Sequence, residues 1–248
     1  MTLPLTVAAF FIAWEVLVRL FEVKSFILPT PSAVIVKVFQ DFVSGGILVH
    51  LWVTLTEVVI GFLLAAAAGI VLGSGIALVG FLNRTLYPFI LAIQTVPKIA
   101  LAPLFLIWFG YGIQSKILTA AMIAFFPILV NVISGIRTID PRRILLMRSL
   151  NASFIEIFLK ARLPSMLPQL FAGLEVGIIF AVIGAIVGEF IGASTGLGSL
   201  IVQRQASVDV AGVFSVLVYL SFMGIGLNLI LRLLTRRFAF WQRSGEGK

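Results

Sequence analysis

The sequence predicts an all-α integral membrane protein of about six transmembrane helices, with one long helical loop on the cytoplasmic side. Of the 248 residues, 60% are hydrophobic and only 11% are charged, whereas soluble domains have ~45–50% apolar and ~25% charged residues. So few polar residues cannot cover a water-soluble core. We therefore expect residues 1–248 to form a single transmembrane domain whose apolar surface faces lipid.

Six segments are apolar enough, and long enough at ~20 residues, to cross ~30 Å of hydrocarbon as helices. They are residues 3–21, 54–82, 86–109, 117–136, 170–191 and 210–234. The second is long enough to tilt or to project beyond the bilayer. No basic segment precedes the first, and no small-residue cleavage site follows it, so we interpret it as a retained helix rather than a signal peptide.

The positions of the basic residues predict how these spans are oriented. Many of the 18 Lys and Arg residues form two clusters: Arg137, Arg142, Arg143, Arg148, Lys160 and Arg162, then Arg232, Arg236, Arg237, Arg243 and Lys248. The positive-inside rule places both clusters in the cytoplasm, and the two spans between them return the chain to that side. The loops near residues 22–50, 110–116 and 193–209 then face outward. Met1 and the Asn83-Arg84 turn face inward, and Arg19, at the outer end of the first span, is the exception.

Composition also excludes several classes of function. There is no Cys and only one histidine, His50, which excludes a disulfide framework, a thiol nucleophile and a thiolate or His-rich metal site. The sequence shows no cluster of metal ligands and no Ser/His/Asp arrangement, so nothing in it indicates an enzyme. The basic residues do not follow one groove interleaved with aromatic residues, so nucleic acid is not an expected partner.

Residues 137–169 form the longest polar stretch on the predicted cytoplasmic side, yet they carry apolar residues at helical spacing. The stripe consists of Ile144, Met147, Asn151, Phe154, Phe158 and Arg162. Asp140 fits an N-cap with Pro141 at the first helical position, and Pro164 and Pro168 are expected to end the segment. The pattern predicts a short helical hairpin at the membrane surface, which is either an ordinary amphipathic linker or a docking surface.

Glycines recur every fourth residue in and after the fifth span. They are Gly173 and Gly177, then Gly184, Gly188, Gly192 and Gly196. This spacing puts small residues on one helix face and predicts close packing against a neighbouring helix. Glu189 lies within this run, and a carboxylate at membrane depth marks an interior or pathway face, because it is costly unless paired, protonated or wetted.

Two prolines interrupt the third span. Pro97 and Pro103 each remove a helical hydrogen bond, so the helix must bend or open there. Lys98 lies beside the first proline and is either a snorkelling interface lysine or an ionisable group of functional interest.

Four stretches, in this order, match the motifs of a known family. Leu28-Pro29-Thr30-Pro31 resembles an L-P-x-P motif, and the segment from Pro97 through Pro103 to Gly110 and Gly112 resembles P-x-x-A-x-x-P-L…W-F-G-x-G. The segment from Leu150 to Gly173 is similar in order and spacing to the family's EAA loop, and Glu189 to Gly198 resembles E-x-x-G-A…G-L-G. Together they resemble the permease subunits of ABC importers, in the branch for nitrate, sulfonate, taurine and pyrimidine precursors.

The resemblance implies a type I ABC importer permease fold in the bacterial cytoplasmic (inner) membrane. It implies pairing with a second permease copy as a homodimer, two cytoplasmic ATPase subunits and a periplasmic or lipid-anchored solute-binding protein. The chain has no G-x-x-x-x-G-K-[ST] loop, so no cofactor is expected in it, and ATP and Mg²⁺ would bind the partner ATPase. The motif residues that it assigns a structural role are Pro97, Pro103, Gly110, Pro164, Pro168, Gly173, Gly196 and Gly198.

Within residues 142–160 the resemblance implies a coupling helix that contacts the ATPase. Its centre consists of Arg148, Ser149, Leu150, Asn151, Ala152, Ser153 and Phe154. Two features depart from the family pattern: Leu145-Leu146-Met147 stands where Glu-Ala-Ala would fall, and Asn151 replaces a glycine. Asn tolerates left-handed backbone angles better than most residues, so we expect the turn to survive.

Polar residues within the spans are candidates for the substrate pathway. They are Gln94, Lys98, Asn131, Glu175 and Glu189, and some should converge at the axis of the dimer. Their mixed charge does not distinguish an anionic substrate from a neutral heteroaromatic one. The alternative function is an ion-coupled secondary transporter, for which internal repeats and ion-coordinating broken helices would be expected; no convincing repeat relates the two halves of the sequence.

Overall fold

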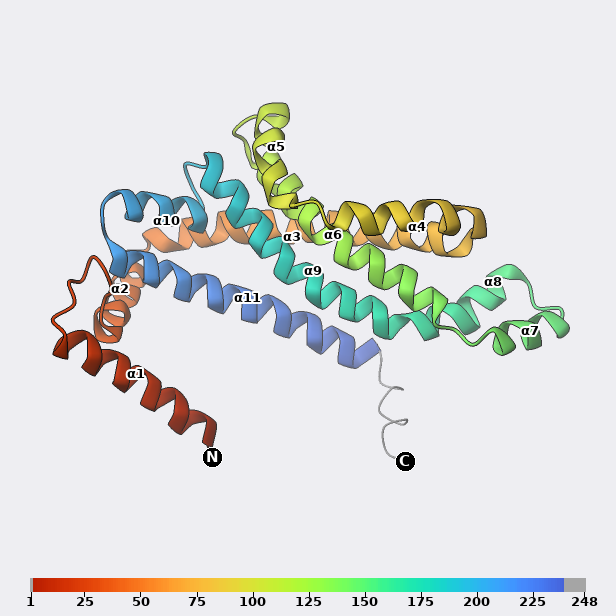
Figure 1. Ribbon diagram of the computed structural model, residues 1–248, viewed down its shortest axis with the longest axis horizontal. Coiled ribbons are helices and arrows are strands. Elements are labelled where there is room, and N and C mark those ends of the chain that lie inside the picture. Colours follow the sequence, from red (N-terminus) through yellow and green to blue (C-terminus); the bar gives the residue numbers. More distant parts are fainter. Residues whose placement is uncertain (1, 239–248) are drawn as a thin grey trace. The chain divides into compact units, whose positions relative to one another are not determined.

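The computed structural model describes residues 2–238, which are helical and contain no strand (Figure 1). In chain order the helices are α1 (Thr2–Leu20), α2 (Pro31–Val43), α3 (Gly46–Leu78), α4 (Gly80–Gln94), the 3₁₀ turn η1 (Lys98–Leu101), α5 (Ala102–Phe109), α6 (Ile113–Arg137), α7 (Pro141–Ser149), α8 (Phe154–Ile157), the π turn η2 (Phe158–Arg162), α9 (Leu163–Gly192), α10 (Leu197–Ala206) and α11 (Val210–Phe238). The predicted all-α membrane fold is confirmed. Arg243 and Lys248, assigned to the C-terminal basic cluster, and Met1 lie outside the described residues.

Five of the six predicted spans correspond to apolar helices of sufficient length. Four single helices within residues 2–238 can cross a membrane: α3, α6, the run Phe154–Gly192 that ends with α9, and α11. A fifth crossing is possible through the pair formed by α4 and the segment Lys98–Phe109. The first predicted span coincides with α1, which is not among these candidates, so a sixth crossing stays a prediction.

The third span is broken where its prolines predict a break. α4 ends at Gln94, and the following segment, Lys98–Phe109, makes an angle of 87° with it. Pro97 is extended, with φ −68° and ψ 91°, and Pro103 lies in the first turn of α5. Because a proline in the first turn of a helix lacks only an N–H that would be unpaired anyway, Pro103 starts the new helix without cost.

The prediction that Pro164 and Pro168 end the cytoplasmic segment is wrong. Both lie in α9, whose helical path is continuous from Phe154 to Gly192. The π turn η2 immediately precedes α9, and its wider hydrogen-bond ladder accommodates the ring and missing N–H of Pro164. Two segments predicted as outer loops, near residues 22–50 and 193–209, contain the helices α2 and α10.

The helices divide into two compact units. Unit 1 combines Met1–Thr56 with Glu189–Met223, and unit 2 combines Glu57–Gly188 with Gly224–Lys248. α3, α9 and α11 each run from one unit into the other.

A buried ion pair joins three elements of unit 1. The Arg204 guanidinium of α10 donates to both carboxylate oxygens of Asp41 in α2, each at 2.7 Å. The Ser215 hydroxyl of α11 donates to the same carboxylate at 2.6 Å, and Asp41 is only 8% exposed. A buried charge must be paired and hydrogen-bonded to be tolerated, so this network fixes the outer helices α2 and α10 against α11.

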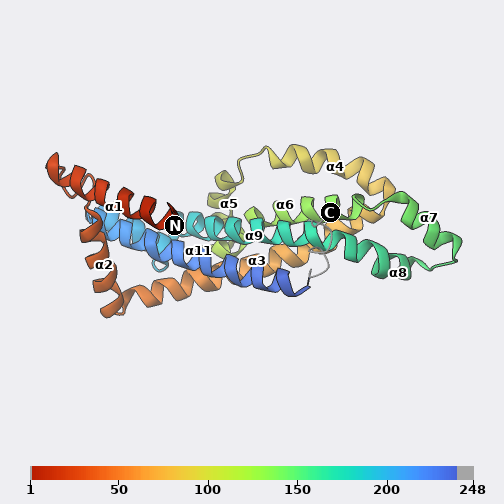
Figure 2. The same cartoon turned by 90° about the horizontal axis from the view of Figure 1, so that it is seen from below.

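In unit 2, α6 is packed on two sides by glycines. Gly61, Gly69 and Gly73 of α3 meet one side, and Gly173, Gly177, Gly184 and Gly188 of α9 meet another. α6 and α9 run side by side in both views (Figures 1 and 2). A Cβ added at Gly184 would lie 2.6 Å from Ala120 Cα, and one at Gly61 would lie 2.7 Å from Ala120 Cβ. The predicted role of the glycine repeat in helix packing is therefore confirmed for its first four members, Gly173, Gly177, Gly184 and Gly188.

We expect Gly61→Ala to destabilise the protein and Gly75→Ala, on the same helix, to leave it unchanged. The added methyl at Gly61 would lie 2.9 Å from the Ile117 carbonyl oxygen, whereas nothing lies within 4 Å at Gly75. Overpacking of this kind costs about 1–3 kcal/mol. Thermal unfolding of the two variants in detergent measures the difference, and equal Tm values would contradict close packing at Gly61.

Candidate functional site

Residues 137–169 contain the predicted helical hairpin, with α7 and α8 as its two arms (Figure 1). The Asp140 carboxylate caps α7 by accepting from the Arg142 backbone N–H at 2.9 Å. Asn151 has φ +56°, a left-handed conformation that asparagine tolerates. Ser153 and Glu156 then form a capping box that starts α8. The hairpin therefore has a defined turn at Asn151, as expected for an asparagine at this position.

A cluster of exposed apolar side chains covers the hairpin, which we call the hairpin patch. Leu150 is 72% exposed and Phe154 is 63% exposed. The other exposed members are Leu145, Leu146, Ile155 and Leu159. Exposed basic residues accompany them: Arg142, Arg143, Arg148 and Lys160. An apolar centre with a charged rim is the usual composition of a protein–protein interface.

The charge of Glu156 stabilises the hairpin turn at neutral pH. Hydrogen bonds from the Ser153 backbone N–H and the Lys160 ammonium lower the pKa of the Glu156 carboxyl from 4.5 to about 2. Because its pKa is depressed in the folded protein, the carboxylate adds stability above pH 4.5 that is lost only as the pH falls through about 2. The capping box is therefore intact throughout the physiological range.

Three of the predicted pathway residues meet at one cavity of unit 2. Gln94, Lys98 and Asn131 line a space of about 260 Å³, together with Ile123, Phe126, Pro127, Val130 and Phe180. The Lys98 ammonium donates to the backbone carbonyl oxygen of Gln94 at 2.9 Å and lies 4.9 Å from the centre of the Phe126 ring. The Gln94 Nε2 atom is buried and has no hydrogen-bond partner among the described residues. Lys98 supplies the one charged donor of this cavity, and the Gln94 and Asn131 side chains supply amide groups that can donate and accept.

The other two predicted pathway residues do not line this cavity. Glu175 forms an ion pair with Arg232 of α11 at 3.4 Å. Glu189 belongs to unit 1, is only 1% exposed, and accepts from the Thr54 hydroxyl at 2.6 Å and from the Gly198 backbone N–H at 2.5 Å. The carboxylate of Glu189 therefore holds the first turn of α10.

Several motif residues surround this contact. Gly196 has φ +119°, where a Cβ would also collide with the Glu189 carboxylate, so only glycine fits. The Gly196 backbone N–H donates to His50 Nδ1 at 3.0 Å, and the Leu197 N–H donates to the Thr54 hydroxyl at 2.8 Å. Nothing in the sequence indicates a role for Thr54, because its partners Glu189 and Leu197 lie more than 130 positions away. Gly110 also has a positive φ, +75°, at the end of α5.

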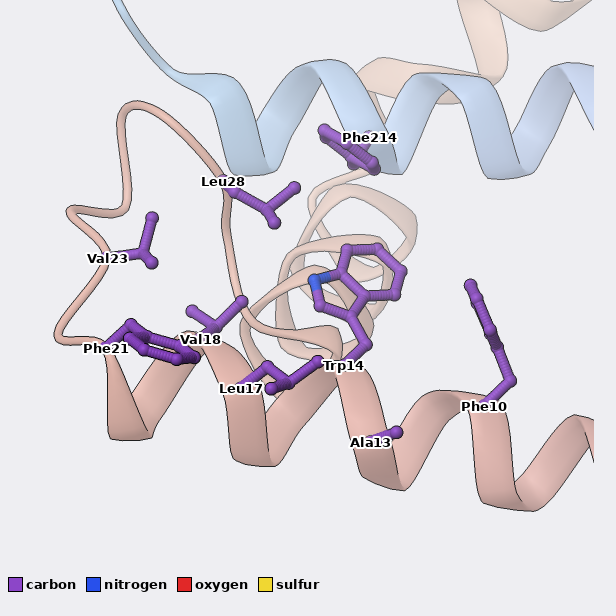
Figure 3. A pocket seen from close by; sticks show the side chains of 9 residues that line it. All are labelled: Phe10, Ala13, Trp14, Leu17, Val18, Phe21, Val23, Leu28 and Phe214. Atoms are coloured by element: carbon purple, nitrogen blue, oxygen red, sulfur yellow. The ribbon is translucent and has the colours of Figure 1, made fainter.

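One cavity of unit 1 is apolar (Figure 3). It measures about 600 Å³ and is lined by Phe10, Ala13, Trp14, Leu17, Val18, Phe21, Val23, Leu28 and Phe214. Its side chains come from α1, from the loop that follows α1 and from α11. The indole N–H of Trp14 is the one polar side-chain group among them, so the cavity is unsuited to a polar solute.

Comparisons with known proteins give matches over most of the chain. Residues 65–240 match the family described as binding-protein-dependent transport system inner membrane component. The chain is 32% identical over 237 residues to SsuC of Bacillus subtilis (strain 168), provisionally named an aliphatic sulfonates transport permease protein, with 94% of this chain and 85% of that protein covered. It is 36% identical over 218 residues to ThiX, the formylaminopyrimidine transport permease protein of Halalkalibacterium halodurans, with 86% and 85% covered.

The fold is similar to that of a solved structure. A chain of the MetNI methionine ABC transporter in an inward facing conformation aligns with a TM-score of 0.66, at 21% identity, over 76% of this chain and 94% of that chain. At this identity the match supports the arrangement of helices alone.

We expect Glu189→Gln to lower stability while leaving the apparent KM for uptake unchanged. The amide can accept at one oxygen only, so either the Thr54 hydroxyl or the Gly198 N–H loses its partner. A buried donor without a partner costs about 1–3 kcal/mol. Thermal unfolding and uptake in vesicles measure the two effects. Thr54→Val removes this hydrogen bond from its other end and also leaves the Leu197 N–H without its acceptor, so it should lower stability at least as much. An altered KM with unchanged Tm would instead place Glu189 in the pathway.

Proposed function

Because the chain belongs to the family of binding-protein-dependent transport system inner membrane components, we propose that it forms the membrane pathway for a small sulfonate-like or pyrimidine-precursor-like solute. The chain is the permease subunit of an ABC importer in the inner membrane, and its partners are an ATPase and a solute-binding protein. The permease is not itself an enzyme, since the ATPase is a separate subunit. We propose further that two copies of the chain pair in the membrane and that ATP and Mg²⁺ are bound by two ATPase subunits.

The hairpin patch is the observation that carries the assignment of the coupling site. Leu150 and Phe154 lie on either side of a capped turn, and both are more than half exposed. Burial of an apolar side chain of this size contributes about 1.5–3 kcal/mol, so a cleft on the ATPase that covers both gains appreciable binding energy. The accompanying arginines add charge complementarity that orients the partner.

The cavity at Lys98, whose one charged group is a hydrogen-bond donor, supports a substrate that carries hydrogen-bond acceptors. The Lys98 ammonium is the one charged group among the residues that line this space, and Gln94 and Asn131 add neutral amide side chains. No carboxylate lines it, so an anion would meet no repulsion from its walls. Sulfonate oxygens and the ring nitrogens of a pyrimidine are both acceptors, which agrees with the names of SsuC and ThiX.

We expect Leu150→Glu to uncouple ATP hydrolysis from transport while the protein still inserts into the membrane. A carboxylate in a desolvated cleft loses its hydration without gaining a partner, which weakens docking of the ATPase. Co-purification of the ATPase, and ATP hydrolysis and uptake in proteoliposomes, measure the effect.

Leu150→Met is the matched control, because it keeps the apolar volume and is expected to retain both activities. Phe154→Glu should reproduce the defect from the other arm of the turn. Normal complex formation and normal uptake in both glutamate variants would contradict the coupling site.

We expect Lys98→Gln to reduce uptake of an anionic substrate by tenfold or more, since the loss of a charge-assisted hydrogen bond costs about 1.5–3 kcal/mol. Lys98→Arg, which keeps the positive charge, should retain most of the uptake. Uptake of a labelled alkanesulfonate and a labelled aminopyrimidine by both variants tests this, with the cognate binding protein present. If the Lys98→Gln variant took up each solute as fast as wild type does, Lys98 would not belong to the pathway.

A further inference from the structure

A second polar cavity of unit 2 lies at the end of α6 that leads into the hairpin. It measures about 380 Å³ and is lined by Gly80, Asn83, Arg84, Tyr87, Pro88 and Arg137. Five of these residues belong to α4, and Arg137 is the last residue of α6. None of them belongs to the cavity at Lys98 or to the hairpin patch.

An apolar core between α4 and α6 positions the two arginines of this cavity. Ile90 of α4 is buried with Leu129 and Ile133 of α6, and Tyr87 packs against this cluster. Residues three or four positions apart lie on one face of a helix. On α4, Arg84 therefore lies on the same face as Tyr87. On α6, Arg137 lies on the same face as Ile133, so each arginine is one turn beyond the core.

The cavity carries positive charge that no acidic residue balances. Neither Arg84 nor Arg137 forms an ion pair with a residue in the range 2–238. The Arg137 guanidinium lies 5.0 Å from the centre of the Tyr87 ring, which orients it through a cation–π contact. Val79 provides no side-chain cap for α4, and nothing lies within 4 Å of a Cβ placed on Gly80, so the first turn of α4 is open to an acceptor.

We propose that this cavity binds the phosphate group of an anionic membrane lipid. Two guanidinium groups supply the planar, multiple donors that recognise phosphate oxygens, and the Asn83 amide lies beside them. Exposed apolar residues on the same helix favour a lipid over a soluble phosphate: Phe81 is 75% exposed and Phe89 is 64% exposed. The acyl chains can pack along these rings while the headgroup lies between the arginines.

The location fits the surface of a bilayer. Arg137 ends a membrane-spanning helix, and the segment that follows it contains the basic cluster of the hairpin. Basic pockets between helices at this level of a membrane protein suit anionic headgroups, and each basic residue near the surface adds appreciable attraction. Arg137 also directly precedes the hairpin, so a bound lipid would hold the start of the loop that leads to the hairpin patch.

Titration of the full-length chain with phosphatidylglycerol tests the proposal. The purified protein in detergent is mixed with phosphatidylglycerol or phosphatidylcholine, and bound lipid is counted by native mass spectrometry while Tm is recorded. We expect phosphatidylglycerol, and not phosphatidylcholine, to bind and raise Tm. The double variant Arg84→Gln, Arg137→Gln should bind phosphatidylglycerol at least about tenfold more weakly, since two cationic contacts are lost.

Arg143→Gln is the matched control, because it removes an exposed arginine from the same side of the protein without touching the cavity. It should bind phosphatidylglycerol as wild type does. The Tm of each variant without lipid confirms that the fold is retained, since both arginines of the cavity are exposed. Wild-type binding by the double variant, or equal binding of the two lipids, overturns the proposal. Equal stabilisation by inorganic phosphate alone also overturns it, since the cavity would then be a site for a soluble anion.

Discussion

Close approach of helices to α6 is the constraint on which the arrangement of unit 2 depends. Between helices in lipid there is no hydrophobic driving force, so association depends on van der Waals contact and needs small residues. Glycines of α3 and of α9 meet α6 on two sides, and both sets contact Ala120. A side chain at either place would separate the helices by more than the range of these contacts. α6 thereby becomes the fixed element to which the polar features of the unit are attached.

Those features occur in order along α6. Asn131 lines the cavity at Lys98, Arg137 lines the basic cavity, and the hairpin follows directly. The hairpin returns through η2 into α9, the other helix packed on α6 by glycines. We therefore expect a movement of the hairpin patch to move α6 and α9 together, since close-packed interiors transmit strain instead of absorbing it. The π turn at Phe158–Arg162 is the place on this path where the helical hydrogen bonding is irregular.

Sequence reasoning identified those features that depend on local pattern. Hydropathy located five spans, the glycine repeat indicated helix packing, and the prolines at 97 and 103 marked the break between α4 and α5. The prediction failed at Pro164 because the π turn Phe158–Arg162 directly precedes this proline. A proline usually ends a regular α-helix, but the wider hydrogen-bond ladder of a π turn leaves room for its ring. Sequence reasoning missed α2 and α10, whose amphipathic sequences are too short and polar to stand out among apolar spans. The ion pair of Asp41 and Arg204 joins residues 163 positions apart, which no local pattern can reveal.

Glu189 and Gln94 together show why depth in the membrane does not by itself identify a pathway residue. A polar group buried in a protein must be satisfied, and the identity of its partner decides its role. The Glu189 carboxylate is satisfied by Thr54 and by the backbone of α10, so its cost is balanced within the fold. The Gln94 amide nitrogen is also buried, but it has no hydrogen-bond partner among the described residues, so its cost is not balanced by a contact of that kind. Burial and polarity alone therefore do not separate a structural residue such as Glu189 from a candidate pathway residue, and the hydrogen-bond partners have to be known.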